Sequence, residues 1–129
     1  MSLYDDLTLD EQVNLWCKFR RLRQNIDTQE FTRIIQLSQH SHKKLRNFSS
    51  GMRQRVKLGL AILSESQILL LDEPVSHLDA NAIAWFQETL TSHIDDRSLL
   101  VASNSDPDET FLCDQLIDVQ QFKKVYQTS

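Results

Sequence analysis

Ile68-Leu69-Leu70-Leu71-Asp72-Glu73-Pro74 runs from four bulky aliphatic residues into two adjacent carboxylates and a proline. This pattern predicts a strand that is buried on both faces and whose tip emerges into a site. Open α/β sheets bind their ligands at the carboxyl ends of strands, which is where Asp72 and Glu73 would lie. Because successive side chains of a strand point to opposite sides, one carboxylate can hold a metal shell while the other activates a water.

The length, composition and net charge limit the classes of protein to which this chain can belong. The 129 residues suffice for one domain with a modest core, and 40% apolar and 25% charged residues are usual for a soluble globular protein. The net charge of -4 argues against nucleic acid or an anionic membrane as a partner. No apolar run is long enough to span a bilayer and no signal peptide precedes the fold, so we expect a cytoplasmic protein. Cys17 and Cys113 are expected to be free thiols.

The first third of the chain predicts two helices and a polar connector. Thr8 and Glu11 have the spacing of a capping box. Asp27 or Thr28 can cap the second helix, and residues 38–47 form the connector. Apolar residues recur at helical intervals in the first helix: Leu9, Val13, Trp16 and Phe19.

From Phe48 onward, predicted strands alternate with predicted helices. A helix opens at Ser49-Ser50-Gly51 and precedes the strand that ends at Asp72. A helix from about Asp79, a second buried strand at residues 99–102, a short helix from Asp106 and a third strand at residues 116–119 follow. This alternation predicts an α/β architecture with a mostly parallel sheet.

The turn Ser49-Ser50-Gly51 places two hydroxyls and a residue without a Cβ at the amino end of a helix. The unpaired N–H groups and the positive end of the helix dipole suit a phosphate, and glycine lets a ligand oxygen approach the backbone. Ordinary N-capping by Ser49 or Ser50 explains the same pattern.

The carboxylates of Asp72 and Glu73 suit Mg²⁺ and water. Mg²⁺ prefers oxygen ligands and keeps part of its water shell, so a strand-tip carboxylate can bind it. The second carboxylate can polarise an attacking water for phosphoryl transfer. Two more polar segments follow this strand and the next, Ser76–Asp79 and Ser103–Ser105; an N-cap at Asp79 and simple turn formation explain them equally well.

Together, these segments resemble the second half of an ATP-binding-cassette (ABC) ATPase. Phe48-Ser49-Ser50-Gly51-Met52 is similar to the family's signature motif, Leu-Ser-Gly-Gly-Gln, and Ile68–Asp72 resembles its Walker B strand. Ser76–Asp79 resembles the D-loop, and Asn104 falls where the family usually has its switch histidine. Three positions depart from the family's pattern: Ser50 replaces the first signature glycine, Met52 the glutamine and Asn104 the histidine.

The resemblance implies the fold class and the domains. It predicts an α/β fold, a partial P-loop NTPase (RecA-like) three-layer parallel sheet that lacks the Walker A strand and is preceded by an all-helical subdomain. The implied domains are the helical subdomain at residues 4–47 and the carboxyl-terminal half of the ABC ATPase core at residues 48–129.

The resemblance also implies a hydrolytic site for ATP with Mg²⁺. Asp72 would organise the metal, and Glu73 would act as the catalytic base. Asn104 would complete the catalytic residues, since its amide can donate a hydrogen bond to a γ-phosphate, although it cannot take up a proton as histidine can.

A second ATPase subunit is the first implied partner. ATP would be sandwiched between two subunits, with Ser49, Ser50, Gly51 and Met52 facing the γ-phosphate held by the partner and Asp79 communicating across the dimer. A membrane-embedded permease would contact the helical subdomain and keep the cytoplasmic ATPase peripheral to the membrane.

No Gly-x-x-x-x-Gly-Lys-Ser/Thr stretch occurs, so these residues lack the phosphate cradle and its lysine. We interpret the chain as part of an ABC transporter ATPase subunit that hydrolyses ATP to drive transport, and we expect the fragment alone to be inactive. The resemblance implies that a central strand is missing between residues 99–103 and 116–119, which would leave unpaired backbone groups on both strands. We therefore expect the fragment to self-associate or rearrange.

Two other functions stay open. The head of a chromosome-maintenance or DNA-repair ATPase also carries signature and Walker B motifs on a carboxyl-terminal lobe. Residues 9–46, however, show no sustained heptad repeat for the coiled coil that such a head needs. The third hypothesis is a non-catalytic half-domain that binds or regulates an intact ATPase.

Overall fold

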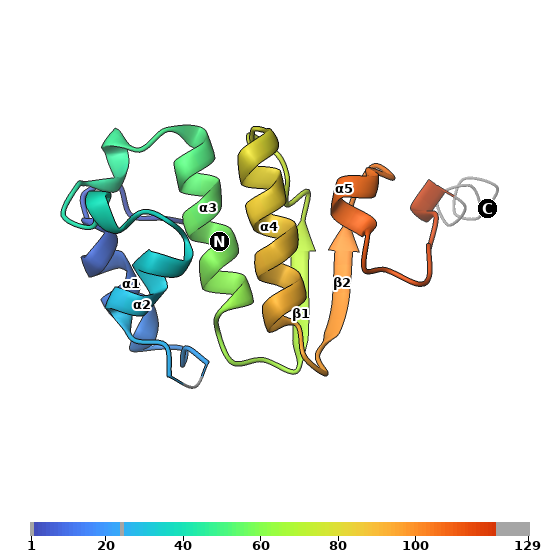
Figure 1. The fold of residues 1–129 in the computed structure, drawn as a ribbon, viewed down its shortest axis with the longest axis horizontal. Helices are drawn as coiled ribbons and strands as arrows, with labels where there is room; N and C mark the ends of the chain where they lie inside the picture. The colour runs from blue at the N-terminus through green and yellow to red at the C-terminus, as the bar shows by residue number, and fades with distance from the viewer. Residues whose placement is uncertain (1, 24, 121–129) are drawn as a thin grey trace, which may run out of the picture.

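The computed structural model describes residues 2–23 and 25–120. Its helices are α1 (Leu9–Cys17), α2 (Thr28–Ile34), α3 (Ser50–Ile62), α4 (Ala80–His93) and α5 (Pro107–Thr110), and its strands are β1 (Ile68–Asp72) and β2 (Ser98–Ala102). Two short 3-10 helices, η1 (Ser38–His40) and η2 (Leu45–Asn47), lie between α2 and α3. Figure 1 shows α1 and α2 at one end, α3 and α4 in the middle, and the strands with α5 toward the other end. None of the helices in the described ranges is long and apolar enough to cross a membrane.

Side-chain caps start the two amino-terminal helices, as predicted. The Glu11 N–H donates to the Thr8 hydroxyl oxygen at 3.2 Å, and the Thr8 N–H donates to the Glu11 carboxylate at 3.0 Å. The backbone hydrogen bond from Thr8, followed by the one involving its side chain, lowers the pKa of Glu11, because both favour the ionised carboxylate. Asp27 accepts from the Glu30 N–H at 2.8 Å and so caps α2.

The prediction that Phe19 continues the apolar face of α1 is wrong. The helix ends at Cys17, and Phe19 is 80% exposed. Beyond the helix the chain runs alongside the end of α3, where the Arg23 N–H donates to the Leu63 carbonyl at 2.8 Å. The turn that follows the helix, in which the Phe19 and Arg20 N–H groups donate to the Trp16 carbonyl at 3.0 and 2.9 Å, leaves the Phe19 side chain in solvent.

The buried face of α3 contacts the end of α2 at Gly59. Val56 and Leu60 on this face are fully buried, and so is Leu63 just after the helix. Gly59 lies where the two helices meet, because a Cβ built on it would stand 2.5 Å from Cγ2 of Ile35. The absence of a side chain at this position therefore sets how closely α3 approaches α2.

The two strands form a parallel sheet, which confirms the predicted α/β class. Ile68 lies opposite Ser98, and the register continues to Asp72 opposite Ala102. The connection between the strands contains α4, which lies in front of β1 in Figure 1. Parallel strands need a crossover of this kind, and a helix is its usual form.

The prediction that β1 is buried on both faces is wrong. Leu69 and Leu71 are 2% and 5% exposed, whereas Ile68 and Leu70 are 59% and 64% exposed. The prediction of a second buried strand at residues 99–102 is wrong for the same reason, because β2 alternates between exposed and half-buried residues, with Leu100 61% exposed. Within the described residues, helices therefore cover only one face of the sheet.

The third predicted strand, at residues 116–119, is absent from the described part of the chain. Leu116, Ile117 and Val119 are 77%, 68% and 63% exposed. The sheet of the described residues contains two strands, β1 and β2. A strand is stabilised by a neighbour that completes its hydrogen bonds, and this apolar run has none beside it.

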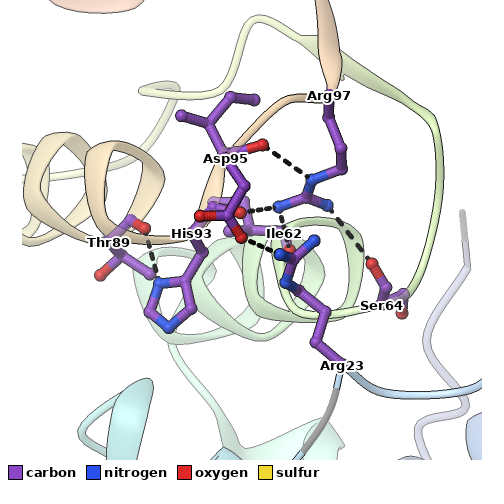
Figure 2. A network of polar contacts seen from close by, with 8 residues as sticks. Arg23, Ile62, Ser64, Thr89, His93, Asp95 and Arg97 are labelled. Atoms are coloured by element: carbon purple, nitrogen blue, oxygen red, sulfur yellow. Dashed lines mark hydrogen bonds and ion pairs between the residues drawn. The ribbon is translucent and has the colours of Figure 1, made fainter.

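A buried arginine ties the ends of two helices to the start of β2 (Figure 2). The Arg97 guanidinium donates to the carbonyls of Ile62 at 2.9 Å and of Ser64 at 3.3 Å, and also to the His93 carbonyl near the end of α4. The Ile62 and His93 carbonyls are the last of α3 and α4, which a helix end leaves unpaired. Burial lowers the pKa of Arg97, and the nearby Arg23 adds to that lowering.

We expect Gly59→Ala to destabilise the fold by about 1–3 kcal/mol, as overpacking does in tight cores. Alanine would otherwise stabilise a helix by about 1 kcal/mol relative to glycine, so the sign of the change reports the clash. Urea unfolding followed by circular dichroism measures the effect. Ser92→Ala on the exposed part of α4 is the control, and an unchanged or higher stability of Gly59→Ala would contradict the close approach.

Candidate functional site

The carboxyl edge of the sheet brings Asp72, Glu73 and Asn104 together. The backbone pairing of the strands extends one residue past β1, because the Glu73 N–H donates to the Ala102 carbonyl at 2.8 Å. The Nδ2 of Asn104 then donates to Oε1 of Glu73 at 3.2 Å. All three side chains are exposed, so this edge offers two carboxylates and one amide to a ligand from solvent.

The backbone of Glu73 adopts a left-handed conformation, with φ at 42°. Residues with a Cβ rarely take this conformation, and it persists only where the surrounding structure holds it. The turn after β1 supplies such support, since the Ser76 N–H donates to the Glu73 carbonyl at 3.1 Å. The kink turns the chain away from the strand direction immediately after Asp72.

The turn at Ser49–Met52 forms the amino end of α3, as predicted. The Ser49 hydroxyl accepts from the Met52 N–H at 3.1 Å, which is ordinary N-capping. Ser49 and Ser50 are exposed, and Met52 lies half-buried against the core. None of the four residues donates or accepts a hydrogen bond to Asp72, Glu73 or Asn104 within residues 2–23 and 25–120.

Gly51 has a second reason to lack a side chain. A Cβ built on it would stand 2.9 Å from the carbonyl oxygen of His77, in the turn between β1 and α4. His77 itself has a φ of 65°. The amino end of α3 therefore packs directly against this turn, independently of any phosphate.

Asp79 caps α4. Its side chain accepts from the Ala82 N–H at 2.8 Å, and its own carboxylate is exposed. The N-cap explanation that the sequence offered for this residue is thus confirmed.

Two residues that the sequence did not single out hold the turn after β1. Nε2 of Gln54 donates to the Pro74 carbonyl at 3.0 Å, and the buried carboxylate of Glu109 accepts from the Val75 N–H at 3.0 Å. Gln54 lies two residues after Met52, the last residue of the signature-like turn, and this proximity was the available signal. Glu109 has the appearance of a helix-dipole acid in the first turn of α5, so nothing distinguished it.

The donor set at the sheet edge suits Mg²⁺. Within the described ranges, the Asp72 carboxylate accepts no hydrogen bond. The same ranges contain no cluster of three or more His, Cys, Asp or Glu side chains that could hold a metal ion by themselves. Mg²⁺ is usually held by one or two carboxylates together with waters and substrate phosphates, rather than by a full protein cage. Asp72, with Glu73 beside it, provides that kind of partial shell.

The site residues at the carboxyl edge of the sheet lie outside two hollows in the described part of the molecule. These hollows have volumes of about 810 Å³ and 880 Å³, one lined by Arg23 and His93 and the other by Asp10 and His42. Neither lining includes Asp72, Glu73 or Asn104. A ligand at the carboxyl edge would meet these three exposed side chains directly from solvent.

We expect Gly51→Ala to lower the melting temperature by roughly 3–6 °C, since the new Cβ forces the turn at His77 to move at a cost of about 1 kcal/mol. Ser50→Ala, at the preceding exposed position, is the control and should melt like the wild type. If Gly51→Ala melts at or above the wild-type temperature without nucleotide, the packing explanation for Gly51 is wrong.

A protein-family model described as ABC transporter matches residues 2–76. ABC transporter F family member 2 of Dictyostelium discoideum is 38% identical over 89 residues, which are 69% of this chain and 15% of that protein. The spermidine/putrescine import ATP-binding protein PotA of Treponema pallidum is 37% identical over 82 residues, which are 61% of this chain and 22% of that protein. The chain thus spans less than a quarter of the length of either relative.

Two solved structures share the fold. An ABC transporter ATP-binding protein from Pyrococcus furiosus aligns with a TM-score of 0.65 and 16% identity, over 81% of this chain and 53% of that one. An ATP-binding subunit of an ABC transporter aligns with a TM-score of 0.64 and 25% identity, over 80% of this chain and 45% of that one. Since the family model covers more than half of the 129 residues, the chain belongs to the ABC transporter family of ATP-binding proteins.

Proposed function

We propose that this chain supplies the hydrolytic half of an ATP site, in which Mg²⁺ is the cofactor. The observation that carries the proposal is the hydrogen bond from Asn104 to Glu73 beside the free carboxylate of Asp72. The family match ends at Ser76, so the assignment of Asn104 and Asp79 rests on geometry and spacing.

The proposed roles follow from the exposure and contacts of each side chain. Glu73 is an exposed carboxylate in a fixed hydrogen bond, which suits a base that takes a proton from water. Asp72 would hold Mg²⁺ through one oxygen and waters. When bound, the metal neutralises charge on the phosphates. Asn104 orients Glu73 and can donate its remaining amide hydrogen to the γ-phosphate.

The amino end of α3 would serve a second ATPase subunit. Ser49, Ser50, Gly51 and Met52 would face the γ-phosphate of ATP held by that subunit, where the N–H groups and dipole of a thirteen-residue helix favour negative charge. Asp79 would lie at the same interface, since the turn that leads to it packs against Gly51. The exposure of both serines is consistent with a partner that approaches from solvent.

Transport is the proposed use of the hydrolysis. PotA of Treponema pallidum is named as an import ATP-binding protein, and so is the trehalose/maltose protein MalK of Thermococcus litoralis, which is 39% identical over 82 residues. By analogy, residues 4–47 would form a helical subdomain that contacts a membrane-embedded permease, and residues 48–129 would form part of the ATPase core. The chain would then be cytoplasmic and peripheral to the membrane.

Self-association is the proposed state of the isolated chain. Ile68, Leu70 and Leu100 give the sheet an apolar exposed face, and β2 has a free edge within the described residues. Exposed sheet edges and apolar patches favour pairing with another chain. A second copy would cover both features.

The hydrolytic role is tested by joining these residues to a Gly-x-x-x-x-Gly-Lys-Ser/Thr segment in one ATPase. We expect the 129 residues alone to show no Mg²⁺-dependent ATP hydrolysis, because the phosphate cradle is absent from them. In the joined protein, Glu73→Gln should lower kcat by about 10²- to 10⁴-fold with little change in KM, as loss of a general base does. Glu88→Gln on the exposed part of α4 is the control. Full activity in the Glu73→Gln protein would contradict the assignment.

Sedimentation measures the association state. We expect the chain to sediment above its monomer mass of 15.1 kDa and Leu70→Lys to shift it toward the monomer, since a charge would be placed on the exposed sheet face. Leu112→Lys, at a position 40% exposed outside the sheet, should leave the mass unchanged. A wild-type chain that stays monomeric at every concentration would rule out self-association.

A further inference from the structure

Glu109 is a buried carboxylate that uses both of its oxygens. The residue is only 4% exposed. Its Oε2 accepts from the Val75 N–H at 3.0 Å, and its Oε1 accepts from the Ser103 hydroxyl at 2.6 Å. A buried carboxylate needs such bonds because they replace the water it has lost. Glu109 therefore joins the turn after β1 to the tip of β2.

The two partners of Glu109 flank the candidate site. Val75 follows Glu73 by two residues, and Ser103 directly precedes Asn104. The Ser103 hydroxyl also accepts from the Asp106 N–H at 3.2 Å, which fixes its orientation. Glu109 thus constrains the backbone on both sides of the 3.2 Å hydrogen bond between Asn104 and Glu73.

The bonds to Glu109 help to stabilise the left-handed backbone conformation at Glu73. A φ of 42° is unfavourable for a residue with a Cβ, so the next residues must be held in place to maintain it. Gln54 holds the Pro74 carbonyl, and Glu109 holds the Val75 N–H. Without the bond to Glu109, the Val75 N–H has no other acceptor in the described residues, and the kink loses part of its support.

We propose that Glu109 is a positioning residue, whose bonds to Val75 and Ser103 hold Glu73 and Asn104 in their hydrogen-bonded arrangement. The relevance of this arrangement to hydrolysis rests on the proposed function. The structural coupling itself can be measured on the chain without nucleotide.

Amide NMR on the ¹⁵N-labelled 129-residue chain tests the coupling. Glu109→Gln preserves size but leaves one acceptor oxygen for two donors. We expect the exchange of the Val75 amide proton to accelerate at least roughly tenfold and the Asn104 side-chain amide signals to shift. Glu88→Gln makes the same chemical change at an exposed carboxylate to which the described structure gives no hydrogen bond, and it should alter neither signal.

A second variant keeps the test decisive if Glu109→Gln does not fold. Ser103→Ala removes the other contact with little loss of volume, and it should also shift the Asn104 side-chain signals. In the double variant with Glu109→Gln, the shift of the Asn104 signals should be smaller than the sum of the two single shifts, since both substitutions break the same hydrogen-bond network. Asn104 signals that stay at their wild-type positions in a folded Glu109→Gln or Ser103→Ala protein would overturn the proposal, even if the protein is less stable. Full hydrolysis after Glu73→Gln would instead contradict the proposed function and leave the NMR result standing.

Discussion

The parallel hydrogen bonding between β1 and β2 is the interaction on which the candidate site depends. Parallel strands end at the same edge, so Glu73 and Asn104, which are 31 positions apart, come within hydrogen-bonding distance. The ladder continues through the Glu73 N–H to Ala102, which fixes the backbone at the point where the chemistry is proposed. A shift of one residue in this register would turn each of the Asp72 and Glu73 side chains to the face opposite the one it now occupies.

The register is in turn set by the helices on the covered face of the sheet. Leu69 and Leu71 are buried, while Ile68 and Leu70 are exposed, so a shift of one residue would expose both buried leucines. Arg97 fixes the other end of the strands by joining the last carbonyls of α3 and α4. Helix α3 therefore links the base of the sheet to the turn beyond its carboxyl edge, where Gly51 meets His77.

Local signals in the sequence predicted most of the elements. Capping residues at Thr8, Asp27, Ser49 and Asp79 marked the helix starts, because a cap is a contact within one turn of its own helix. The run Ile68–Asp72 matched β1 over its full length. These features depend on near neighbours and are therefore visible in a single sequence.

Features that depend on distant partners could not be predicted in the same way. Phe19 lies at a helical interval, yet the helix ends at Cys17, and the chain beyond it runs alongside the end of α3, where Arg23 bonds to Leu63. The strand predicted at 116–119 has suitable residues but no neighbouring strand. Glu109 resembles any acid at a helix start, and only the folded chain shows that its carboxylate reaches Val75, 34 positions away.

The substitution of asparagine at position 104 alters the proposed proton path without removing the contact. A histidine at this position would change its charge near pH 6.5, so its bond to a carboxylate would vary with pH. The Asn104 amide donates to Glu73 and does not change its own charge over this pH range, because it has no ionisable proton there. It also cannot accept the proton that Glu73 would take from water. Since Glu73 is exposed, that proton would leave to solvent from the carboxylate itself, and Asn104 would orient the base without sharing its charge.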